Sequence, residues 1–395
     1  MPDLRLRQMI RASAAAGFAG GLLVACASAV EPAAAGDSGF TVTGTDGAVL
    51  AATPLETFDS PWAMTFLPDG RAVVTEKGGA IWLLNAEGTK AGQITGGPRV
   101  TARGQGGLGD FILHPDFAET GEVYVSYVER DASNDAHSGA VVERAVLTLT
   151  ATGGTLGRRE VIWRQYPKVT GNGHYGHRLV VSPDRHLFVT SGERQKFTPA
   201  QDMSQNLGKI VRLNLDGSVP EDNPFADQGG VAAEVWTLGH RNPLGIGFDG
   251  AGRLWSHEMG PAHGDELNLI ERGANYGYPE VSNGNHYDGR KIPHHDTRPE
   301  FAAPAAYWVP AISPAGFAIY GGDLFADWTG DGFIGGMNDP ALVRVSLHED
   351  GSAAEAGRYE WGKRVREVAE GPDGALYVLE DREGGRLVRL APAGG

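Results

Sequence analysis

The sequence predicts an all-β fold, because one short pattern recurs along the chain and no long amphipathic helical pattern accompanies it. The pattern is an apolar run, a Pro-Asp or Asp-Gly turn and a second, alternating run, which is typical of a β-hairpin. The 58 glycines and 23 prolines agree with many tight turns. Copies occupy 61–76, 107–129, 176–193, 242–260 and 365–381, and a divergent sixth copy covers 314–337.

The turn residues of each copy independently predict a hairpin at that place. Proline presets the backbone angle of a turn, and Asp and Gly accept the conformations that follow it. In chain order the turns are LPDG at 67–70, HPDF at 114–117, SPDR at 182–185, FDGAG at 248–252 and GPDG at 371–374, while the divergent copy turns through GGDLFADWTGDG at 321–332.

The number of copies predicts the architecture. Further strand-like runs follow several hairpins: AIWLLN, KIVRLNL, ELNLIE, ALVRVSL and RLVRLA. Roughly six units, spaced about 45 to 70 residues apart, indicate a six-bladed β-propeller with four-stranded antiparallel blades. A β-sandwich has similar turns, but the count of copies favours the propeller. The long insertions 193–235 and 271–313 are expected to be loops on one face, where function usually lies.

The N-terminus has the pattern of an export signal. Arg5, Arg7 and Arg11 precede ASAAAGFAGGLLVA, an apolar run too short and too rich in Ala and Gly to span a membrane. The run ends at Cys26, the only cysteine of the chain, in a sequence that resembles the bacterial lipobox. We therefore predict a periplasmic lipoprotein anchored to the membrane only through Cys26. The alternative is a soluble periplasmic protein cut after Ala29 or Ala35.

This interpretation divides the chain into three parts: a signal peptide at 1–25, a flexible tether at 26–40 and a propeller domain at 41–395. The net charge of −15 argues against nucleic acid or an anionic membrane surface as a partner. An anionic ligand would therefore need a local basic patch. Because the rest of the chain has no cysteine, the domain contains no disulfide.

Five segments carry a resemblance to a known family. They are RGQGGLGD at 103–110, GHYGHRLVVSPD at 173–184, LGHRNPLGIGF at 238–248, EMGPAHGDELNLI at 258–270 and GANYGYP at 273–279. Together they resemble the soluble sugar dehydrogenases that use pyrroloquinoline quinone (PQQ), in their aldose sugar dehydrogenase branch, over about residues 50 to 390. The resemblance implies a six-bladed propeller, in agreement with the repeats. It also implies a monomer that oxidises the C1 hydroxyl of aldoses to lactones and passes electrons to a quinone, a cytochrome or an artificial dye.

Two histidines, His174 and His177, lie three apart in the glycine-rich stretch 171–179. From the residues alone they are polar loop residues or a zinc pair, although a glycine-rich run that leads into a strand would splay a zinc pair. The resemblance implies that His174 is the general base and that Glu193 is the carboxylate that orients it, where the family more often has Asp. His177 is interpreted as structural.

The remaining candidates concern cofactor and metal. Arg364 and Arg366 alternate along KRVRE, so they share a face and can take carboxylates, unless the strand is simply an exposed ion-pair strand. The resemblance implies that Arg241 faces the quinone oxygen, that Asn242 and Gln105 contact the cofactor, and that the carbonyls of Gly260 and Pro261 hold calcium. It further implies a second calcium at Glu266 and Tyr276. Where relatives have a lysine this chain has Asn338, and near their threonine it has Ser313.

Two other functions compete with this one. A calcium-dependent propeller lactonase would need metal and carboxylates but no basic cradle, so Arg364 and Arg366 argue against it. A non-catalytic propeller that binds a partner would use its aromatic loops, and it would not respond to quinone and calcium.

Overall fold

The computed structural model describes residues 39–394. The predicted signal peptide, Cys26 and nearly all of the predicted tether lie outside this range. Within it, no helix is long and apolar enough to cross a membrane. The helices are one short α-helix and five 3-10 turns: α1 (Phe117–Thr120), η1 (Thr198–Gln201), η2 (Ala226–Gln228), η3 (Gly230–Glu234), η4 (His295–Thr297) and η5 (Ala326–Trp328).

Every predicted hairpin is present as an antiparallel strand pair. The pairs are β3–β4, β7–β8, β12–β13, β16–β17, β20–β21 and β24–β25. In the third pair, Leu179 lies opposite Val189 and Val181 opposite Leu187, so alternate side chains enter the core on one face. The predicted all-β class is therefore confirmed.

Five sheets hold all the strands of the described range. One five-stranded sheet runs β1 (Phe40–Thr43), β2 (Val49–Asp59), β26 (Glu383–Pro392), β25 (Leu376–Glu380) and β24 (Val365–Glu370). Three are four-stranded: β12 (Gly176–Val181), β13 (His186–Ser191), β14 (Lys209–Asn214) and β15 (Val235–Leu238); β16 (Pro243–Phe248), β17 (Leu254–Glu258), β18 (Asp265–Ile270) and β19 (Ala306–Trp308); β20 (Pro314–Ile319), β21 (Gly332–Gly336), β22 (Ala341–Leu347) and β23 (Ala353–Glu360).

The nine-stranded fifth sheet joins two four-stranded groups. The first is β3 (Pro61–Phe66), β4 (Ala72–Glu76), β5 (Ile81–Leu84) and β6 (Lys90–Thr95), and the second is β7 (Leu108–Leu113), β8 (Glu122–Arg130), β9 (His137–Thr150) and β10 (Gly153–Arg164), with β11 (Val169–Thr170) beside β9. A short parallel pairing of β6 with β10 links the groups, where Gly154 lies opposite Ile94.

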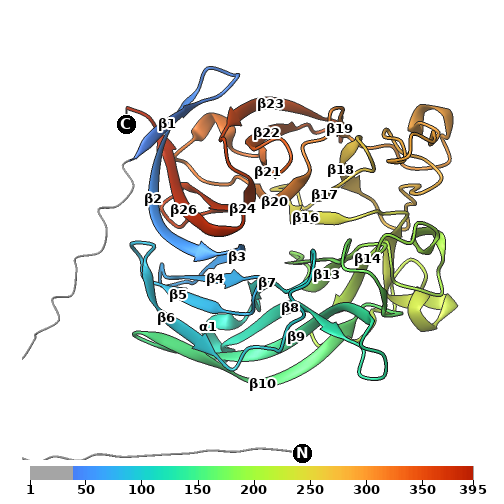
Figure 1. The fold of residues 1–395 in the computed structure, drawn as a ribbon, viewed down its shortest axis with the longest axis horizontal. Coiled ribbons are helices and arrows are strands. Elements are labelled where there is room, and N and C mark those ends of the chain that lie inside the picture. The colour runs from blue at the N-terminus through green and yellow to red at the C-terminus, as the bar shows by residue number, and fades with distance from the viewer. Residues whose placement is uncertain (1–38, 395) are drawn as a thin grey trace, which may run out of the picture. The chain divides into compact units, whose positions relative to one another are not determined.

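The first strand of each hairpin lies at the centre. Strand β3 contacts β7, β7 contacts β12, β12 contacts β16, β16 contacts β20, β20 contacts β24, and β24 returns to β3. Figure 1 shows the sheets around this common centre in chain order, from blue to red. The fold of residues 39–394 is thus a propeller-like ring of antiparallel sheets.

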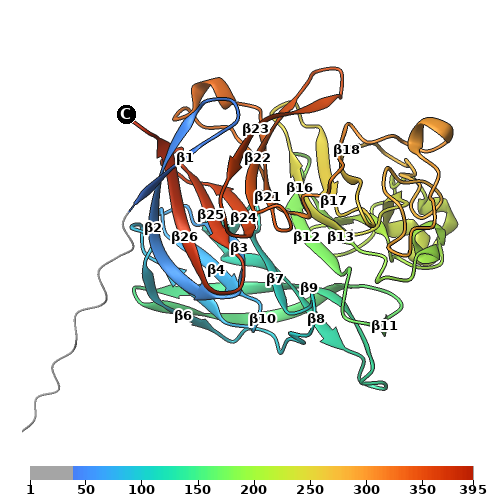
Figure 2. The same ribbon diagram turned by 45° about the horizontal axis from the view of Figure 1, so that its top comes forward.

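The ring is closed by strands from opposite ends of the chain. Strand β2 pairs along its length with β26, and Figure 2 shows the blue strand beside the red one. Leu50 of β2 is buried and packs with Val388 and Leu390 of β26. Apolar clusters of this kind fill the space between neighbouring sheets.

The centre of the ring is polar, in contrast to the clusters between the sheets. Arg178 of β12 forms ion pairs with Asp110 of β7 and Glu367 of β24, and its guanidinium lies 4.0 Å from the ring centre of Trp62 on β3. All four side chains are buried. Because buried charges need partners, this cluster ties four inner strands together beneath the cavity described below.

Replacing Leu50 with alanine is expected to destabilise the domain by about 2–5 kcal/mol, because the truncation leaves a cavity at the closing pair of strands. Urea unfolding measures the change. The matched control is Leu324→Ala, at a position that is 38% exposed, which should change stability by less than about 0.5 kcal/mol. A loss at Leu50 no larger than at Leu324 would show that the β2–β26 closure does not hold the fold.

Candidate active site

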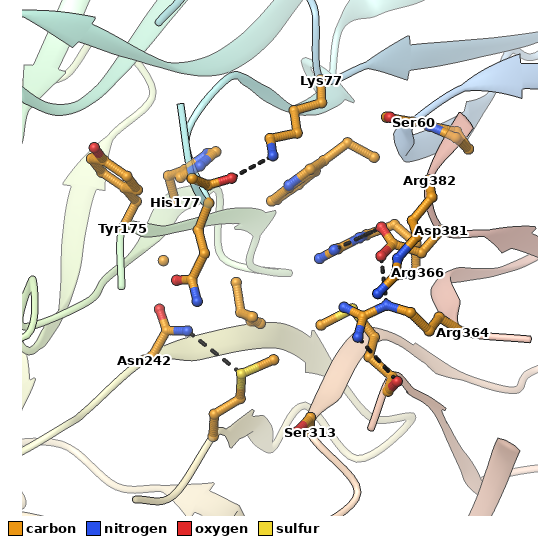
Figure 3. Close-up of a pocket in the computed structure, with 18 of the residues that line it drawn as sticks. Ser60, Lys77, Tyr175, His177, Asn242, Ser313, Arg364, Arg366, Asp381 and Arg382 are labelled. Carbon is orange, nitrogen blue, oxygen red and sulfur yellow. Dashed lines mark hydrogen bonds and ion pairs between the residues drawn. The ribbon is translucent and has the colours of Figure 1, made fainter. Parts of the chain in front are cut away.

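A cavity of about 450 Å³ lies where the inner strands begin. Trp62, His177 and Arg366 are the second residues of β3, β12 and β24. Loops before and after the inner hairpins supply most of the other side chains. Figure 3 shows Lys77 at the top of this cavity, Ser60, Arg364, Arg366 and Asp381 on its right, Ser313 at the bottom and Asn242 on the opposite, left side. Residues that are far apart in the chain meet here because the ring closes.

This cavity is positively charged. Its lining includes Lys77, Arg364, Arg366 and Arg382 against a single carboxylate, Asp381, so four positive charges and one negative leave a net of +3. The Asp381 carboxylate accepts hydrogen bonds from Arg364 Nε (2.7 Å) and Arg366 Nε (2.9 Å), which fixes both guanidiniums. Against a chain of net charge −15, this is the local basic patch that an anionic ligand requires.

A second cavity, of about 240 Å³, adjoins the first, and Tyr287 borders both. At its wall His174 Nδ1 lies 2.5 Å from Glu193 Oε1. Both residues are buried, and the second Glu193 oxygen accepts the backbone N–H of Phe197 (2.6 Å). Since an ionised carboxylate only accepts, Nδ1 carries the proton and the other ring nitrogen is left to accept one from a ligand.

The charge states of this pair follow from its surroundings. Burial lowers the pKa of His174 below its ordinary value, and the nearby Arg241 adds to this, outweighing the hydrogen bond to Glu193. Burial opposes ionisation of Glu193, but the hydrogen bond from His174 prevails together with the backbone N–H of Phe197 and the charge of Arg241, and the pKa of Glu193 lies below its usual value. At neutral pH the pair is therefore a neutral imidazole held by a carboxylate, which suits a general base.

The two histidines of the glycine-rich stretch point to different places. Both have left-handed backbones, with φ of 51° at His174 and 62° at His177. The ring of His177 stacks on Trp62 (5.0 Å between centres), and its Nδ1 lies 2.9 Å from Ser126 Oγ. Burial lowers the pKa of His177 to about 3. His177 therefore packs as a structural residue on the cavity floor, and the two histidines do not form a zinc pair.

Arg241 and Asn242 stand between the two cavities. Arg241 Nη1 donates to the Met259 carbonyl (2.9 Å), and Asn242 Nδ2 lies 3.9 Å from Met259 Sδ. Arg241 Nε and Asn242 Oδ1 are buried and have no hydrogen-bond partner among residues 39–394. Gln105 lies nearby and uses its Oε1 to accept the backbone N–H of His174 (2.6 Å). Buried polar atoms without partners indicate that a ligand completes the site.

Asp265 holds the loop that carries Gly260 and Pro261. Its carboxylate accepts the backbone N–H groups of Gly260 (2.8 Å) and Ser313 (2.7 Å). A Cβ at Gly260 would collide with the carbonyl oxygens of the two residues before Asp265, so only glycine fits there. No described residue donates a hydrogen bond to the carbonyl of Gly260 or Pro261.

The pair predicted for a second calcium lies close by. Glu266 Oε1 lies 3.2 Å from His295 Nε2, and the Tyr276 hydroxyl donates to the Leu269 carbonyl (2.5 Å). Both residues border a void of about 10 Å³ together with Gly260 and Pro261. Within residues 39–394 no group of three or more His, Cys, Asp or Glu side chains is arranged to hold a metal ion.

The structure brings most predicted site residues together, with one exception. Asn338 is exposed and does not border the cavity, whereas its neighbour Met337 does and accepts a hydrogen bond from Arg364 at its carbonyl (3.2 Å). Sequence analysis missed Lys77, Asp381, Arg382 and Tyr287. Lys77 and Arg382 each follow the second strand of a predicted hairpin, and that position was the available indication.

The fold and the site together define an enzyme, with an oriented base at the edge of a cationic cavity. The family model of glucose/sorbosone dehydrogenases matches residues 58–389, and the chain therefore belongs to that family of oxidoreductases. Aldose sugar dehydrogenase YliI of Escherichia coli K12 is 37% identical over 342 residues, which are 85% of this chain and 90% of that protein.

Solved structures agree with this assignment. The apo form of the soluble aldose sugar dehydrogenase from Escherichia coli superposes with a TM-score of 0.81 at 35% identity, covering 87% of this chain and 99% of that one. The PQQ-bound aldose sugar dehydrogenase from Streptomyces coelicolor superposes with a TM-score of 0.69 at 28% identity, covering 87% and 98%.

Proposed function

We propose that this protein oxidises the C1 hydroxyl of aldose sugars to lactones, with PQQ as the acceptor of hydride and calcium as its partner ion. The observation that carries the proposal is the juxtaposition of the His174–Glu193 pair with a cavity of net charge +3. A base alone would serve a hydrolase, but a lactonase has no use for Arg364 and Arg366. The PQQ-bound relative from Streptomyces coelicolor supports the choice of cofactor.

The cavity fits PQQ by charge and by donor groups. PQQ carries three carboxylates, which match the net charge of +3. Arg364 and Arg366 are already oriented by Asp381, so little entropy is lost when they bind an anion. The unpartnered Arg241 Nε and Asn242 Oδ1 offer a donor and an acceptor at the boundary with the His174 cavity. PQQ would lie against these residues and Gln105.

The oxygen atoms around Gly260 fit calcium. Calcium prefers hard oxygen ligands, including main-chain carbonyls, at flexible geometry. The carbonyls of Gly260 and Pro261 have no donor among the described residues, and Asp265 fixes the loop that carries them. The second calcium at Glu266 and Tyr276 remains part of the proposal.

The residues of the chain have separate roles in the reaction. When bound, PQQ supplies the electrophilic carbon that accepts hydride, and calcium polarises the quinone. His174 accepts the proton of the sugar C1 hydroxyl at its free ring nitrogen while Glu193 fixes the imidazole and stabilises its positive charge. Arg241 provides a permanent cation for the negative charge that develops on the acceptor. Aromatic walls at Phe197 and Tyr278 exclude water around the sugar.

The blade count, the cellular location, the oligomeric state and the electron acceptor are also part of this proposal. The closed ring of six inner strands supports a six-bladed count, with the nine-stranded sheet as two blades linked at β6 and β10. We also propose export to the periplasm, a lipid anchor at Cys26, a monomeric state and reoxidation by a quinone, a cytochrome or a dye.

The direct test is reconstitution of the purified protein with PQQ and calcium, followed by aldose-dependent reduction of an artificial dye. The expected result is dye reduction that requires both additions and yields the lactone of the sugar. Lactone hydrolysis without quinone would instead favour the lactonase. No reaction of either kind in a folded protein would favour a non-catalytic binding protein.

The pH profile of kcat/KM should report the lowered pKa of His174. A base with a lowered pKa stays neutral to lower pH, so activity should persist as pH falls to 6.5 and decline only below that value. The charged groups that act on this imidazole are Glu193, Arg241 and Arg194, and Asp288 and Arg290 line the same cavity. An acidic limb centred above pH 7 would contradict the assignment of His174 as a neutral base.

Removal of calcium by a chelator should abolish dye reduction and weaken PQQ retention, because the carbonyl oxygens of Gly260 and Pro261 cannot hold the quinone without the ion. Calcium should restore both properties. Magnesium should restore them poorly, since it requires a smaller and more regular octahedral site. Full activity after exhaustive chelation, with metal content checked by emission spectroscopy, would exclude a catalytic calcium.

A further inference from the structure

Arg194 is a buried cation next to Glu193, whose negative charge favours the ionised guanidinium. Its exposed fraction is 0%, and it forms no ion pair among residues 39–394. Burial lowers the pKa of Arg194 to about 10, so the guanidinium stays charged at neutral pH. Burying a charge is costly unless hydrogen bonds compensate it. Here three of them go to backbone carbonyls, and two longer ones, of 3.5 Å each, go to the side chains of Gln165 and Ser138. Because burying this charge is unfavourable, we expect Arg194 to have a functional role.

The guanidinium of Arg194 donates hydrogen bonds to backbone carbonyls of the loop that carries His174. Nε donates to the Gly173 carbonyl (2.9 Å) and Nη2 to the Gly171 carbonyl (2.7 Å). Nη1 donates to the Ser138 carbonyl (2.5 Å) on the neighbouring strand β9. The guanidinium carbon also lies 3.7 Å from the ring centre of Tyr175. Arg194 therefore contacts this loop on both sides of His174 and anchors it to β9.

The backbone of Arg194 takes part as well. Its N–H donates to the carbonyl of His174 (3.2 Å), and a Cβ at Gly192, two residues earlier, would collide with that same carbonyl. The His174 carbonyl is thus held against the strand end that also carries Glu193. The backbone of His174 is therefore held against Arg194, and its imidazole contacts Glu193, the residue next to Arg194.

The loop needs this support because its backbone is unusual. With φ of 51°, His174 occupies the left-handed region, which is unfavourable for a non-glycine residue and persists only where surrounding contacts hold it. The turn directs several carbonyls inward, and buried carbonyls need donors. Only arginine presents five donors in one rigid plane, so lysine could pair with some of these carbonyls but not all.

We propose that Arg194 is a positioning residue, which holds the 171–175 loop so that His174 meets Glu193 with one ring nitrogen and presents the other to the substrate. The effect on turnover rests on the proposed function, whereas the effect on the imidazole does not. Arg194 lines neither cavity, so it acts through the loop that it holds, in which His174 borders one cavity and Tyr175 the other. Its charge has a secondary effect, since it helps to keep the imidazole neutral.

The test compares Arg194→Met and Arg194→Lys with the matched control Arg212→Met. Arg212 lies on β14, which pairs with the strand β13 that ends shortly before Arg194. Its buried guanidinium lies 5.1 Å from the ring centre of Trp236 and pairs with Asp222 (2.7 Å), and Arg212 is far from the His174 loop along the chain. Arg194→Met should lower kcat roughly 100-fold with little change in KM, since small misplacements of a reacting group have effects of that size. Arg194→Lys should recover part of the loss, and Arg212→Met should leave kcat within about twofold of the parent at a temperature where all variants are folded.

Two further readouts separate positioning from loss of stability. The acidic limb of kcat/KM should move to higher pH in Arg194→Met, because removal of a positive charge favours the imidazolium. In nitrogen-15 NMR of His174, the Nδ1–H tautomer should be single in the parent and mixed in Arg194→Met. This NMR measurement needs no substrate, so it tests the inference even if the parent fails to oxidise any aldose, which would overturn the proposed function alone.

Three outcomes would overturn the inference. The first is an unchanged kcat and a single His174 tautomer in folded Arg194→Met. The second is an equal loss of kcat in Arg212→Met. The third is parental kcat and tautomer in Arg194→Lys, which would show that the planar fork is not needed. If Arg194→Met does not fold, Arg194→Lys decides, with a mixed tautomer and lowered kcat as the supporting result.

Discussion

His174→Ala is expected to lower kcat for aldose oxidation by about 10²–10⁴-fold while leaving the affinity for PQQ within a few fold of the parent. The size follows from the loss of a positioned general base. Affinity for PQQ should persist because the cationic lining of the larger cavity does not include His174. Dye-reduction kinetics at saturating aldose, with PQQ binding followed by its absorbance, measure the two effects separately.

The control for this substitution is His186→Ala, on β13, the strand that pairs with the β12 following His174. His186 pairs with Asp184 (3.2 Å) at the start of β13, at the opposite end of this strand from Glu193. Its loss should leave kcat unchanged within about twofold. Glu193→Gln offers an intermediate case, because the amide keeps the volume but removes the charge that favours the protonated imidazole. If His174→Ala turned over as fast as His186→Ala, proton abstraction would belong to another residue.

Arg366→Ala is expected to weaken PQQ binding by about 10–100-fold, because charge-assisted hydrogen bonds to a carboxylate are each worth roughly 1.5–3 kcal/mol. The double change Arg364→Ala with Arg366→Ala should reduce binding further, until reconstitution fails at micromolar PQQ. Titration of the apoprotein with PQQ in calcium, monitored by recovered dye reduction and by absorbance, measures both.

Substitution of Asp381 distinguishes the effect of cavity charge on PQQ binding from the effect of arginine orientation. It binds both arginines, so their removal leaves a carboxylate facing the cavity, and part of the loss would be repulsion of the anionic ligand. Asp381→Asn raises the net charge of the lining from +3 to +4 and keeps the volume, while loosening the two guanidiniums. If Arg366→Ala bound PQQ as tightly as the surface control Arg389→Ala, the cavity would not be a cradle for carboxylates.

Local chemistry made the fold class predictable. Turns such as those at Asp69 and Asp373 depend on residues next to one another, so the hairpins could be located from the sequence. The link between β6 and β10 could not, because it depends on where two outer strands meet after the ring has formed. Closure through β2 and β26 joins residues more than three hundred positions apart, and no local pattern encodes it.

Some residues of the candidate site could likewise be predicted from the sequence, and others could not. His174, Glu193, Arg241 and Gln105 lie in motifs that resemble a known family, and the structure brings them to one place. Lys77 and Arg382 lie in unremarkable turns and reach the cavity only because the ring places them there. At 337–338 the sequence favoured the polar residue, yet the strand end turns Met337 inward and leaves Asn338 outside.

Rapid mixing of the PQQ- and calcium-loaded protein with an aldose deuterated at C1 tests the central claim most directly. We predict that the absorbance of the bound quinone changes within one turnover, that the rate shows a primary isotope effect relative to unlabelled sugar, and that the lactone is the product. The same mixing with His174→Ala should slow the change by the factor found for kcat. An absorbance change that is absent with every aldose tried, or that shows no isotope effect while lactone is hydrolysed without quinone, would contradict the account.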